Sequence, residues 1–265
     1  MDIIVLVKQV PDTSEIKIDK ETNTLIRAGV KSIINPDDLA GVEEALRLKE
    51  RFGGTVSIVT MGPRQAENML KELYARGVDQ TYLLTDRKFA GSDTLATSTI
   101  ISSFLKTLKY DLIIAGYQAI DGDTAQVGPQ VAELLSIPQV TYLQEIVEVV
   151  DKSIIVKKRT TSKMLTLKVT MPCLITTLSD MNKPRYMNAM DIFNSTDKEV
   201  NIVTLVDLVV DETKIGLKGS PTWVKKTFVK PVMQKSAKQV YSPEEAAKLI
   251  AQKIYPYIEV NHNEK

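Results

Sequence analysis

The strongest constraint on the fold is a regular alternation of short apolar runs with longer amphipathic stretches over the first half of the chain. Runs rich in Val, Ile and Leu are typical of buried parallel strands, and apolar residues at helical spacing between them indicate covering helices. We predict strands at residues 3–7, 55–60, 82–84 and 112–116, and helices at about 36–52, 65–76, 93–108 and 125–135. This rhythm predicts an α/β fold, a mostly parallel doubly wound sheet with helices on both faces.

Local signals predict where the helices begin and end. Asn35 is predicted to cap the first helix, because a proline and two aspartates follow it and suit a helix start. Gly53 and Gly54 are predicted to end that helix. Ser92 is predicted to cap the helix at 93–108, and Gly77 to close the helix at 65–76.

The second half of the chain is rich in strand-forming residues. Apolar runs lie at residues 146–150, 154–157, 164–169 and 174–177, and turn residues separate the first three. We therefore predict an added antiparallel meander over residues 141–178. Two short alternating pieces at 15–18 and 24–26 predict a hairpin near the N-terminus.

The C-terminal part is expected to be an arm that ends in a helix. Periodicity is weak from residue 182 to 238, and glycine and proline make residues 214–235 extended. Ser242 and Glu245 then form a capping box. The apolar positions of the last helix are Ala246, Leu249, Ile250 and Ile254. We divide the chain into an α/β domain, 1–198, and an arm, 199–265, whose helix docks on another protein or packs back on its own domain.

Composition excludes several classes of function. Thirty-four lysines and arginines against 33 acidic residues give a net charge of +1, which argues against a dedicated nucleic-acid binder. With one cysteine, Cys173, and one histidine, His262, we expect no disulfide, Ser-His-Asp triad or His-based zinc site. We see no signal peptide and no apolar run of the roughly 18–20 residues that span a membrane. The expected location is cytoplasmic.

Ligands are expected at one edge of the sheet, because open parallel sheets bind ligands at the carboxyl ends of their strands. The segments 8–12, 61–63 and 116–129 follow predicted strands and should converge there with residues 35–38. The longest, 116–129, runs from a Gly-Asp turn into a predicted helix, whose first N–H groups suit a phosphate. It matches neither the P-loop nor the dinucleotide Gly-x-Gly-x-x-Gly pattern.

The residues alone leave two interpretations of this segment open. Asp121 and Asp123 repel phosphate, so they fit better as turn and cap formers or as acceptors for ribose hydroxyls or an adenine amino group. Alternatively, the segment is only a well-capped turn. Elsewhere we interpret Cys173 as a buried apolar residue, His262 as a solvated tail residue and Trp223 as an interface or core anchor. A chain with so few catalytic groups is expected to rely on a bound cofactor.

Several motifs together resemble a known family. They are Val7-Lys8-Gln9-Val10-Pro11-Asp12, Asn35-Pro36-Asp37-Asp38, Glu43 to Lys49, Met61-Gly62-Pro63, Gln118 to Pro129, Pro138-Gln139 and Asn182-Lys183-Pro184-Arg185-Tyr186. In this order, over about residues 1–198, they resemble the β subunit of electron transfer flavoprotein. The resemblance implies a heterodimer with an α subunit that holds an FAD. It also implies a second adenine nucleotide, AMP or FAD, in the present chain.

The resemblance further implies which residues bind the nucleotide. Leu6, Asn35, Asp38, Met61 and residues 121–132 would line the pocket, with Lys8 and Gln9 near its mouth. The implied cofactor-binding set is Leu6, Lys8, Gln9, Asn35, Asp38, Met61, Ser92, Asp93, Thr94, Thr97, Asp121, Gly122, Asp123, Thr124, Ala125, Gln126, Val127, Gly128 and Pro129. Gly122 would let the backbone approach the ligand closely.

The bound nucleotide separates two kinds of family member. Housekeeping members keep a structural AMP and carry electrons from acyl-CoA dehydrogenases to a quinone reductase. Bifurcating members bind FAD, take hydride from NADH (or return it to NAD), and divide the electrons between ferredoxin or flavodoxin and, through the α-subunit FAD, a client flavin dehydrogenase. Residues 121–129 and 89–98 resemble the bifurcating version, in which the polar groups of 92–97 would bond the ribityl or pyrophosphate. The alternatives are an AMP-binding housekeeping subunit and a nucleotide-binding protein without a redox role.

The resemblance also implies surfaces for partners. Residues 182–198 correspond to the segment that recognises client dehydrogenases, with Pro184, Arg185, Tyr186, Ala189, Ile192 and Phe193 as its recognition residues. Ala189 stands where the housekeeping type has leucine, and no lysine cluster follows. We therefore expect a different client, an acyl-CoA or a 2-hydroxyacid dehydrogenase such as lactate dehydrogenase. Thr160-Thr161-Ser162 replaces the acidic residues and glycine of many members, so that loop is given no role. The arm, 199–265, is expected to contact the α subunit.

Overall fold

The computed structural model describes residues 1–12, 17–18, 25–26, 31–223, 225 and 239–260. The chain divides into two units, Met1–Lys226 and Thr227–Lys265. The first unit continues past the boundary at 198 that we chose from the sequence, because β13 (Asn201–Val203) pairs with β7 (Gln80–Leu84) in the main sheet. His262 lies outside the described residues.

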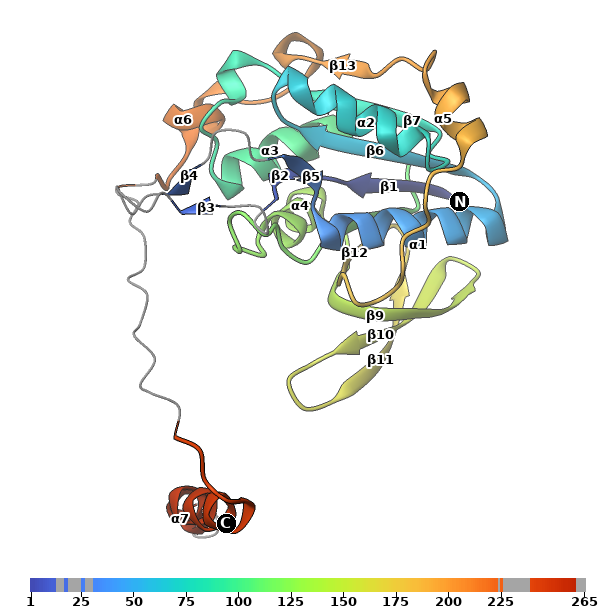
Figure 1. The fold of residues 1–265 in the computed structure, drawn as a ribbon. Helices are drawn as coiled ribbons and strands as arrows, with labels where there is room; N and C mark the ends of the chain where they lie inside the picture. The colour runs from blue at the N-terminus through green and yellow to red at the C-terminus, as the bar shows by residue number, and fades with distance from the viewer. Residues whose placement is uncertain (13–16, 19–24, 27–30, 224, 226–238, 261–265) are drawn as a thin grey trace. The chain divides into compact units, whose positions relative to one another are not determined.

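The predicted mixed α/β architecture is confirmed. The main sheet has nine strands in the order β11-β10-β9-β12-β8-β1-β6-β7-β13. Its parallel part is formed by β1 (Asp2–Leu6), β6 (Thr55–Met61), β7, β8 (Leu112–Gly116), β12 (Cys173–Thr177) and β13. All of these strands therefore present their carboxyl ends at the same edge, and the arrowheads of β1 and β6 in Figure 1 point toward it.

The antiparallel part has three strands, and they project from one end of the sheet (Figure 1). They are β9 (Gln139–Val150), β10 (Ser153–Arg159) and β11 (Met164–Thr170). The prediction that the fourth apolar run belongs to this meander is wrong. β12 instead lies parallel between β8 and β9, because its buried side chains complete the core beside β8.

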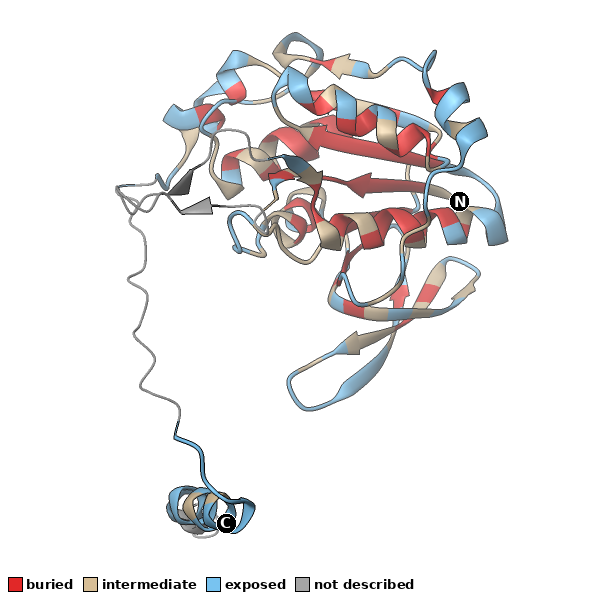
Figure 2. Cartoon of the chain, in the orientation of Figure 1, coloured by how far each residue is buried: buried red, intermediate tan, exposed pale blue. Residues whose placement is uncertain are grey.

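Helices cover both faces of the parallel part. On one face α1 (Pro36–Phe52) and α2 (Glu67–Tyr74) share an apolar cluster with Ile3 and Val5 of β1. On the other face α3 (Thr94–Leu105) and α4 (Val127–Leu135) pack against Ile4 and Leu6. Alternate residues of β1 thus enter opposite cores, and Figure 2 shows β1 and β6 buried along most of their length.

Of the two predicted N-caps, Asn35 is right in position only and Ser92 is wrong. Asn35 is at the N-cap position of α1, but its side chain makes no capping hydrogen bond. Asp93, not Ser92, caps α3 by accepting a hydrogen bond from the Ala96 N–H at 3.0 Å. The glycine stops are confirmed: Gly53 ends α1 at φ 69°, and Gly77 follows α2 at φ 104°.

Short elements fill the remaining described regions. β2 (Gln9–Pro11) pairs with β5 (Ser32–Ile34), and β3 (Lys17–Ile18) pairs antiparallel with β4 (Leu25–Ile26) where we predicted a hairpin. Further along the chain, α5 (Ala189–Ser195), β13 and α6 (Gly216–Gly219) interrupt the stretch expected to be irregular.

The second unit contains α7 (Pro243–Val260), which begins with the predicted capping box. The Ser242 N–H donates to Glu245 at 3.1 Å, and the Glu245 N–H donates to the Ser242 hydroxyl at 3.3 Å. Ile250 and Ile254 of its apolar face are exposed in this unit. In the part of the chain that the structure describes, no helix combines the length and apolar character needed to cross a membrane.

Candidate functional site

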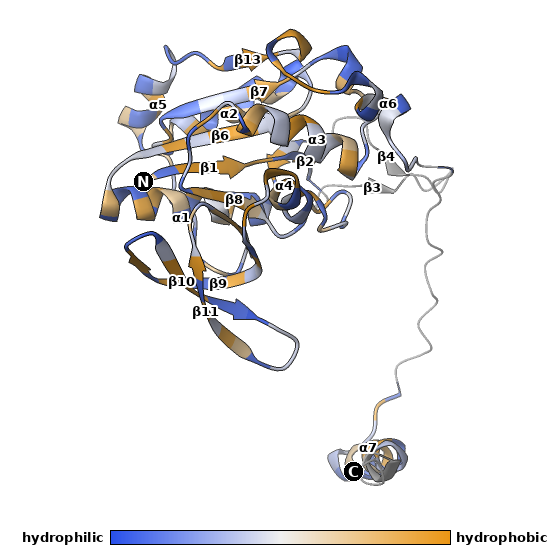
Figure 3. Cartoon of the chain, turned by 180° about the vertical axis from the view of Figure 1, so that it is seen from behind, coloured by the Kyte–Doolittle hydropathy of each residue, from blue (hydrophilic) through white to orange (hydrophobic). Residues whose placement is uncertain are grey.

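The predicted site residues come together at the carboxyl edge of β8, β1, β6 and β7, which are neighbours in the sheet. Figure 3 shows this edge from the side of α3 and α4. Leu6 is buried as the last residue of β1, and Gln9 begins β2 directly beyond it. Three groups of contacts build the edge, and each joins residues far apart in the sequence.

The first group centres on Asp38, in the first turn of α1. Its carboxylate accepts hydrogen bonds from the Lys8 N–H at 2.7 Å and the Gly116 N–H at 3.0 Å. Burial raises the pKa of Asp38 to about 7 against the opposing effect of these hydrogen bonds. A Cβ at Gly116 would fall on the same carboxylate, so a glycine is required there. One buried side chain therefore fixes the exits of both β1 and β8.

Asn35 and Asp37 hold the loop that follows β8. The Asn35 amide donates to the Gln118 carbonyl at 2.8 Å, and its oxygen accepts from the Ile120 N–H at 3.2 Å. Asp37 accepts from the Gln118 N–H at 3.3 Å and from the Ser179 N–H at 2.8 Å. Asn35 is fully buried, and its side chain provides hydrogen-bond partners for backbone groups of the loop that are themselves partly buried. This explains why its side chain is not free to cap α1.

The exposed tip of the loop is held by an ion pair. The Lys8 ammonium lies 2.7 and 2.8 Å from the two carboxylate oxygens of Asp121. Residues 121–124 are exposed, and no atom lies within 4 Å of a Cβ built at Gly122. Asp123 and Ala125 have φ values of 50° and 53°, which is uncommon for alanine. The loop is thus held by hydrogen bonds at residues 118 and 120 and by the ion pair at Asp121, and the space next to Gly122 is open.

The second group joins the starts of α3 and α4. The Thr94 hydroxyl donates to the Gln126 side chain at 2.8 Å, and the Ser98 hydroxyl donates to Gln130 at 3.0 Å. Thr97 is half-buried on the same helix. The first N–H groups of a helix have no partner within it, so the start of α4 at Val127 offers donors beside this junction.

Pro129 follows in the first turn of α4, and Gly128 has a packing role there. Gly128 is buried, and a Cβ on it would lie 3.0 Å from the methyl group of Thr176 in β12. The glycine therefore lets α4 approach the sheet. This role is separate from any direct contact with a ligand.

In the third group, the side chains of Ser92 and Asp93 are hydrogen-bonded to other residues of the chain. The Ser92 hydroxyl donates to the Phe89 carbonyl at 2.7 Å and accepts from the Gly216 N–H at 3.1 Å. The Asp93 carboxylate accepts from the N–H and hydroxyl of Thr222 at 3.0 and 2.7 Å. Although burial favours the protonated form, these bonds and the Ala96 N–H hold the pKa of Asp93 below its ordinary value. Both side chains fasten residues 216–222 to the start of α3.

A cavity of about 420 Å³ lies where β6 and β7 end. Its walls are Met61, Gly62, Pro63, Leu84, Thr85, Asp86, Arg87, Phe89, Ala90, Gly91 and Ser92. Met61 and Ser92 were predicted for the site, whereas residues 84–87 were missed. The end of the predicted strand 82–84 was the available signal, because the residues after it must reach the same edge.

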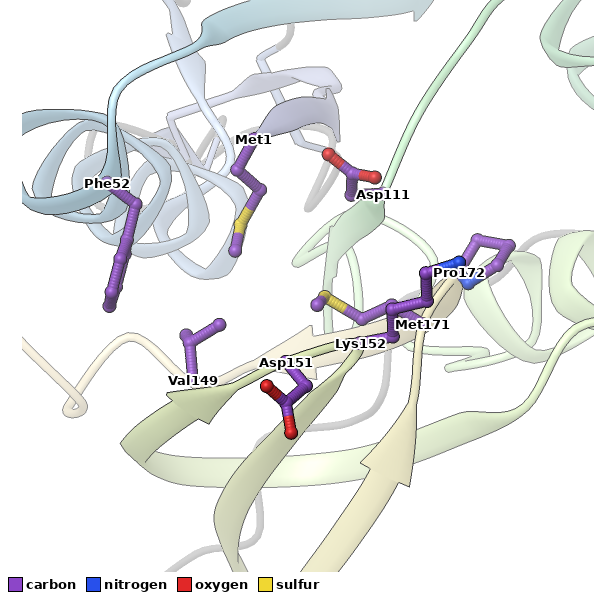
Figure 4. Close-up of a pocket in the computed structure, with 8 residues that line it drawn as sticks. All are labelled: Met1, Phe52, Asp111, Val149, Asp151, Lys152, Met171 and Pro172. Carbon is purple, nitrogen blue, oxygen red and sulfur yellow. The ribbon is translucent and has the colours of Figure 1, made fainter.

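A second cavity, of about 410 Å³, lies at the opposite edge of the sheet (Figure 4). It is lined by Met1, Phe52, Asp111, Val149, Asp151, Lys152, Met171 and Pro172. None of the predicted site residues reaches it. Within the described residues, no group of three or more His, Cys, Asp or Glu side chains is placed to hold a metal ion.

The predicted recognition residues form a different surface, on and before α5, which packs beside α2 (Figure 1). Tyr186 and Phe193 are 96% and 74% exposed, and Ala189 and Ile192 are also exposed. Pro184 and Arg185 are half-buried, and the Arg185 guanidinium is bound to Glu43. The structure therefore divides the segment into an exposed part and a fastened part.

Comparison with known proteins shows the family of the chain. A family model described as the electron transfer flavoprotein domain matches residues 22–208. A relative from Clostridium acetobutylicum named electron transfer flavoprotein subunit beta is 52% identical over 232 residues, 88% of this chain and 89% of the relative. The chain belongs to the electron transfer flavoprotein β-subunit family.

Two further relatives of this β subunit come from reductase systems. The CarD subunit of a caffeyl-CoA reductase-Etf complex from Acetobacterium woodii is 46% identical over 87% of this chain and 88% of the relative. The acryloyl-CoA reductase electron transfer subunit gamma of Anaerotignum propionicum is 46% identical over 87% of this chain and 89% of the relative. Membership of an electron-transfer family favours a redox role over the non-redox alternative.

Proposed function

We propose that this β subunit binds FAD at the carboxyl edge of its sheet and takes part in NADH-linked electron bifurcation or confurcation. The observation that carries the proposal is the junction of Thr94 with Gln126, beside the exposed loop 121–124. AMP ends at one phosphate, whereas FAD continues through a pyrophosphate and a ribityl chain. A site for FAD therefore needs further polar groups beyond the adenosine, and Thr94 and Gln126 would supply them by exchanging their mutual hydrogen bond for bonds to the ligand.

The residues present fit such a group. The first N–H groups of α4 offer donors for a pyrophosphate. Asp121, which would repel phosphate, is neutralised by Lys8 at 2.7 Å. The open space above Gly122 leaves room for a ligand against the backbone. When bound, FAD supplies hydride acceptance and one-electron transfer, which the side chains of this site do not provide.

The protein's own contribution is to hold this edge in place before a ligand arrives. Asp38 fixes the exits of β1 and β8, and Asn35 fixes the backbone at Gln118 and Ile120. Ordering these groups in advance reduces the entropy lost on binding. The apolar cavity beside Met61 would keep water from the part of the ligand that enters it.

The proposed partners follow from the family. An α subunit with its own FAD would complete the heterodimer, with residues 199–265 contacting it. Ferredoxin or flavodoxin would accept the low-potential electron, and a flavin dehydrogenase would be the client. The two relatives named for acyl-CoA reductases favour an acyl-CoA client over a 2-hydroxyacid client. Residues 182–198 would form the client-docking surface.

The test replaces hydroxyls of α3 in the heterodimer and measures bound flavin. Thr94→Val and Thr97→Val should lower FAD from two per heterodimer toward one, the α-subunit FAD being retained. Thr99→Val is the matched control, because its hydroxyl donates to the Leu95 carbonyl within α3. Full flavin content in both test variants would contradict the assignment of this helix start. One FAD and one AMP in the wild type would indicate the housekeeping type instead.

A further inference from the structure

The segment before α5 is fastened to α1 through Arg185, and we propose that this arginine is a positioning residue for client docking. The inference rests on the proposed role of residues 182–198. We define the docking surface as the exposed apolar side chains of this segment, Tyr186, Met187, Met190, Ile192 and Phe193. Arg185 would act by fixing the chain from which these side chains project.

Arg185 is bound through both its side chain and its main chain. Its guanidinium donates to the two oxygens of Glu43 at 2.9 and 3.2 Å, and also to Glu50. Its N–H donates to Glu43 at 3.0 Å, and its carbonyl accepts from the Arg76 guanidinium at 2.6 Å. The residue is therefore held between α1, which carries both glutamates, and the end of α2.

Glu43 is a buried carboxylate whose charge depends on this contact. Its side chain is 6% exposed, and burial by itself would raise its pKa. The hydrogen bonds and charge of Arg185, with a smaller contribution from Arg47, outweigh burial and hold the pKa of Glu43 below its ordinary value. Removing the arginine would leave a buried charge with weaker compensation, which is costly. The pair thus gives the segment one preferred position.

Among the described residues, no hydrogen bond or ion pair joins residues 186–195 to α1, although α5 packs beside α2. Tyr186, next to the fastened arginine, is 96% exposed, and α5 has seven residues, too short to be stable as an isolated helix. Asn188 caps α5 locally by accepting from the Asp191 N–H at 2.8 Å. Before the surface, the Asn182 amide donates to the Ala40 carbonyl of α1 at 3.0 Å. Arg185 is therefore the last strong attachment to α1 before the exposed side chains begin.

This geometry favours a positioning role for Arg185 over the direct recognition that the resemblance implies. The arginine side chain is 32% exposed, and its donors are directed at Glu43 and Glu50. It acts on a partner through the position of its neighbours. An ordered surface loses less entropy on docking, so loosening it should weaken the encounter with the client and leave the later electron transfer unchanged.

The test uses the assembled heterodimer and two flavin dehydrogenases as probes, a short-chain acyl-CoA dehydrogenase and a lactate dehydrogenase. The probe that turns over faster with the wild type is then titrated against each variant. Arg185→Met should raise the KM for the dehydrogenase about tenfold, with kcat within about twofold. Arg185→Lys should give an intermediate KM, because an ammonium cannot replace a bidentate guanidinium. Flavin content should not change.

Phe193→Ala separates the two levels of the proposal. If Phe193→Ala raises KM and Arg185→Met does not, the surface is used but the positioning role is overturned. If neither variant changes KM, the surface is not the docking site, and the inference fails with it. If the heterodimer with Arg185→Met fails to assemble, the variants Arg185→Lys and Glu43→Gln test the positioning role instead. Both should raise KM and speed hydrogen exchange at the Arg185 N–H, and unchanged KM in both would overturn the proposal.

Discussion

Gly116→Ala is expected to destabilise the β subunit, because the added methyl group would fall on the carboxylate of Asp38. The methyl would also lie 2.8 Å from the Asp38 backbone nitrogen and 3.0 Å from the Cβ of Asp37. Both of these neighbours belong to the first turn of α1. Rotating the Asp38 side chain therefore cannot remove the conflict by itself.

The magnitude follows from the contacts that must be given up. If Asp38 turns away, the Lys8 and Gly116 N–H groups lose their acceptor, at about 1–3 kcal/mol for each donor left buried. If α1 shifts instead, the strain in a well-packed core costs about 1–3 kcal/mol. We expect a loss of about 3 kcal/mol, which is a large part of the roughly 5–15 kcal/mol that stabilises a typical protein.

Urea unfolding of the full-length chain, followed by far-ultraviolet circular dichroism, measures this loss. The single tryptophan, Trp223, is 75% exposed and would report little by fluorescence. With an m-value of about 2 kcal/mol per molar urea, the midpoint should fall by about 1.5 M. Gly122→Ala is the matched control and should stay within about 0.5 kcal/mol, because its Cβ meets open space. Equal midpoints for the two variants would refute the reasoning.

Lys8→Met should barely change the urea midpoint, because exposed ion pairs such as Lys8–Asp121 contribute about 0–1 kcal/mol to stability. Equilibrium dialysis of the same variant in the heterodimer should nevertheless show weaker FAD binding. Asp93→Ala should cost about 1–2 kcal/mol through the lost cap of α3. Urea titrations at several pH values test the role of the charge. Because the pKa of Asp93 is lowered in the native state, the stability difference between wild type and variant should be complete above pH 3.8 and should disappear as the pH falls through the native pKa. Burial raises the pKa of Cys173 to about 12, so a disulfide reagent should label it only as fast as the chain unfolds, and rapid labelling of the native chain would contradict its buried position.

The strands of the parallel sheet were predictable because both faces of each strand are buried. Continuous apolar runs such as 112–116 report that burial directly. The pairing partners of the strands were not predictable in this way, because an apolar run does not indicate which strand lies beside it. β12 was therefore placed in the meander, although Ile175 pairs parallel with Ile114 of β8.

The site was predictable at the level of which edge it occupies, and less so at the level of contacts. The motifs placed Lys8, Asn35 and residues 116–129 on one edge, but no local pattern shows that the Asn35 amide binds a loop more than 80 residues away. A capping residue type before a helix is a local signal, and here a distant partner takes the side chain. Glu43 went unassigned for the same reason, because only the fold brings Arg185 against it.

The central claim is an FAD site in this chain, and cofactor stoichiometry tests it most directly. The chain is co-expressed with its α subunit, and the purified heterodimer is denatured so that released FAD and AMP can be quantified. Our account predicts FAD at twice the heterodimer concentration and no AMP. FAD and AMP in equal amounts would contradict it and would show a one-flavin electron carrier.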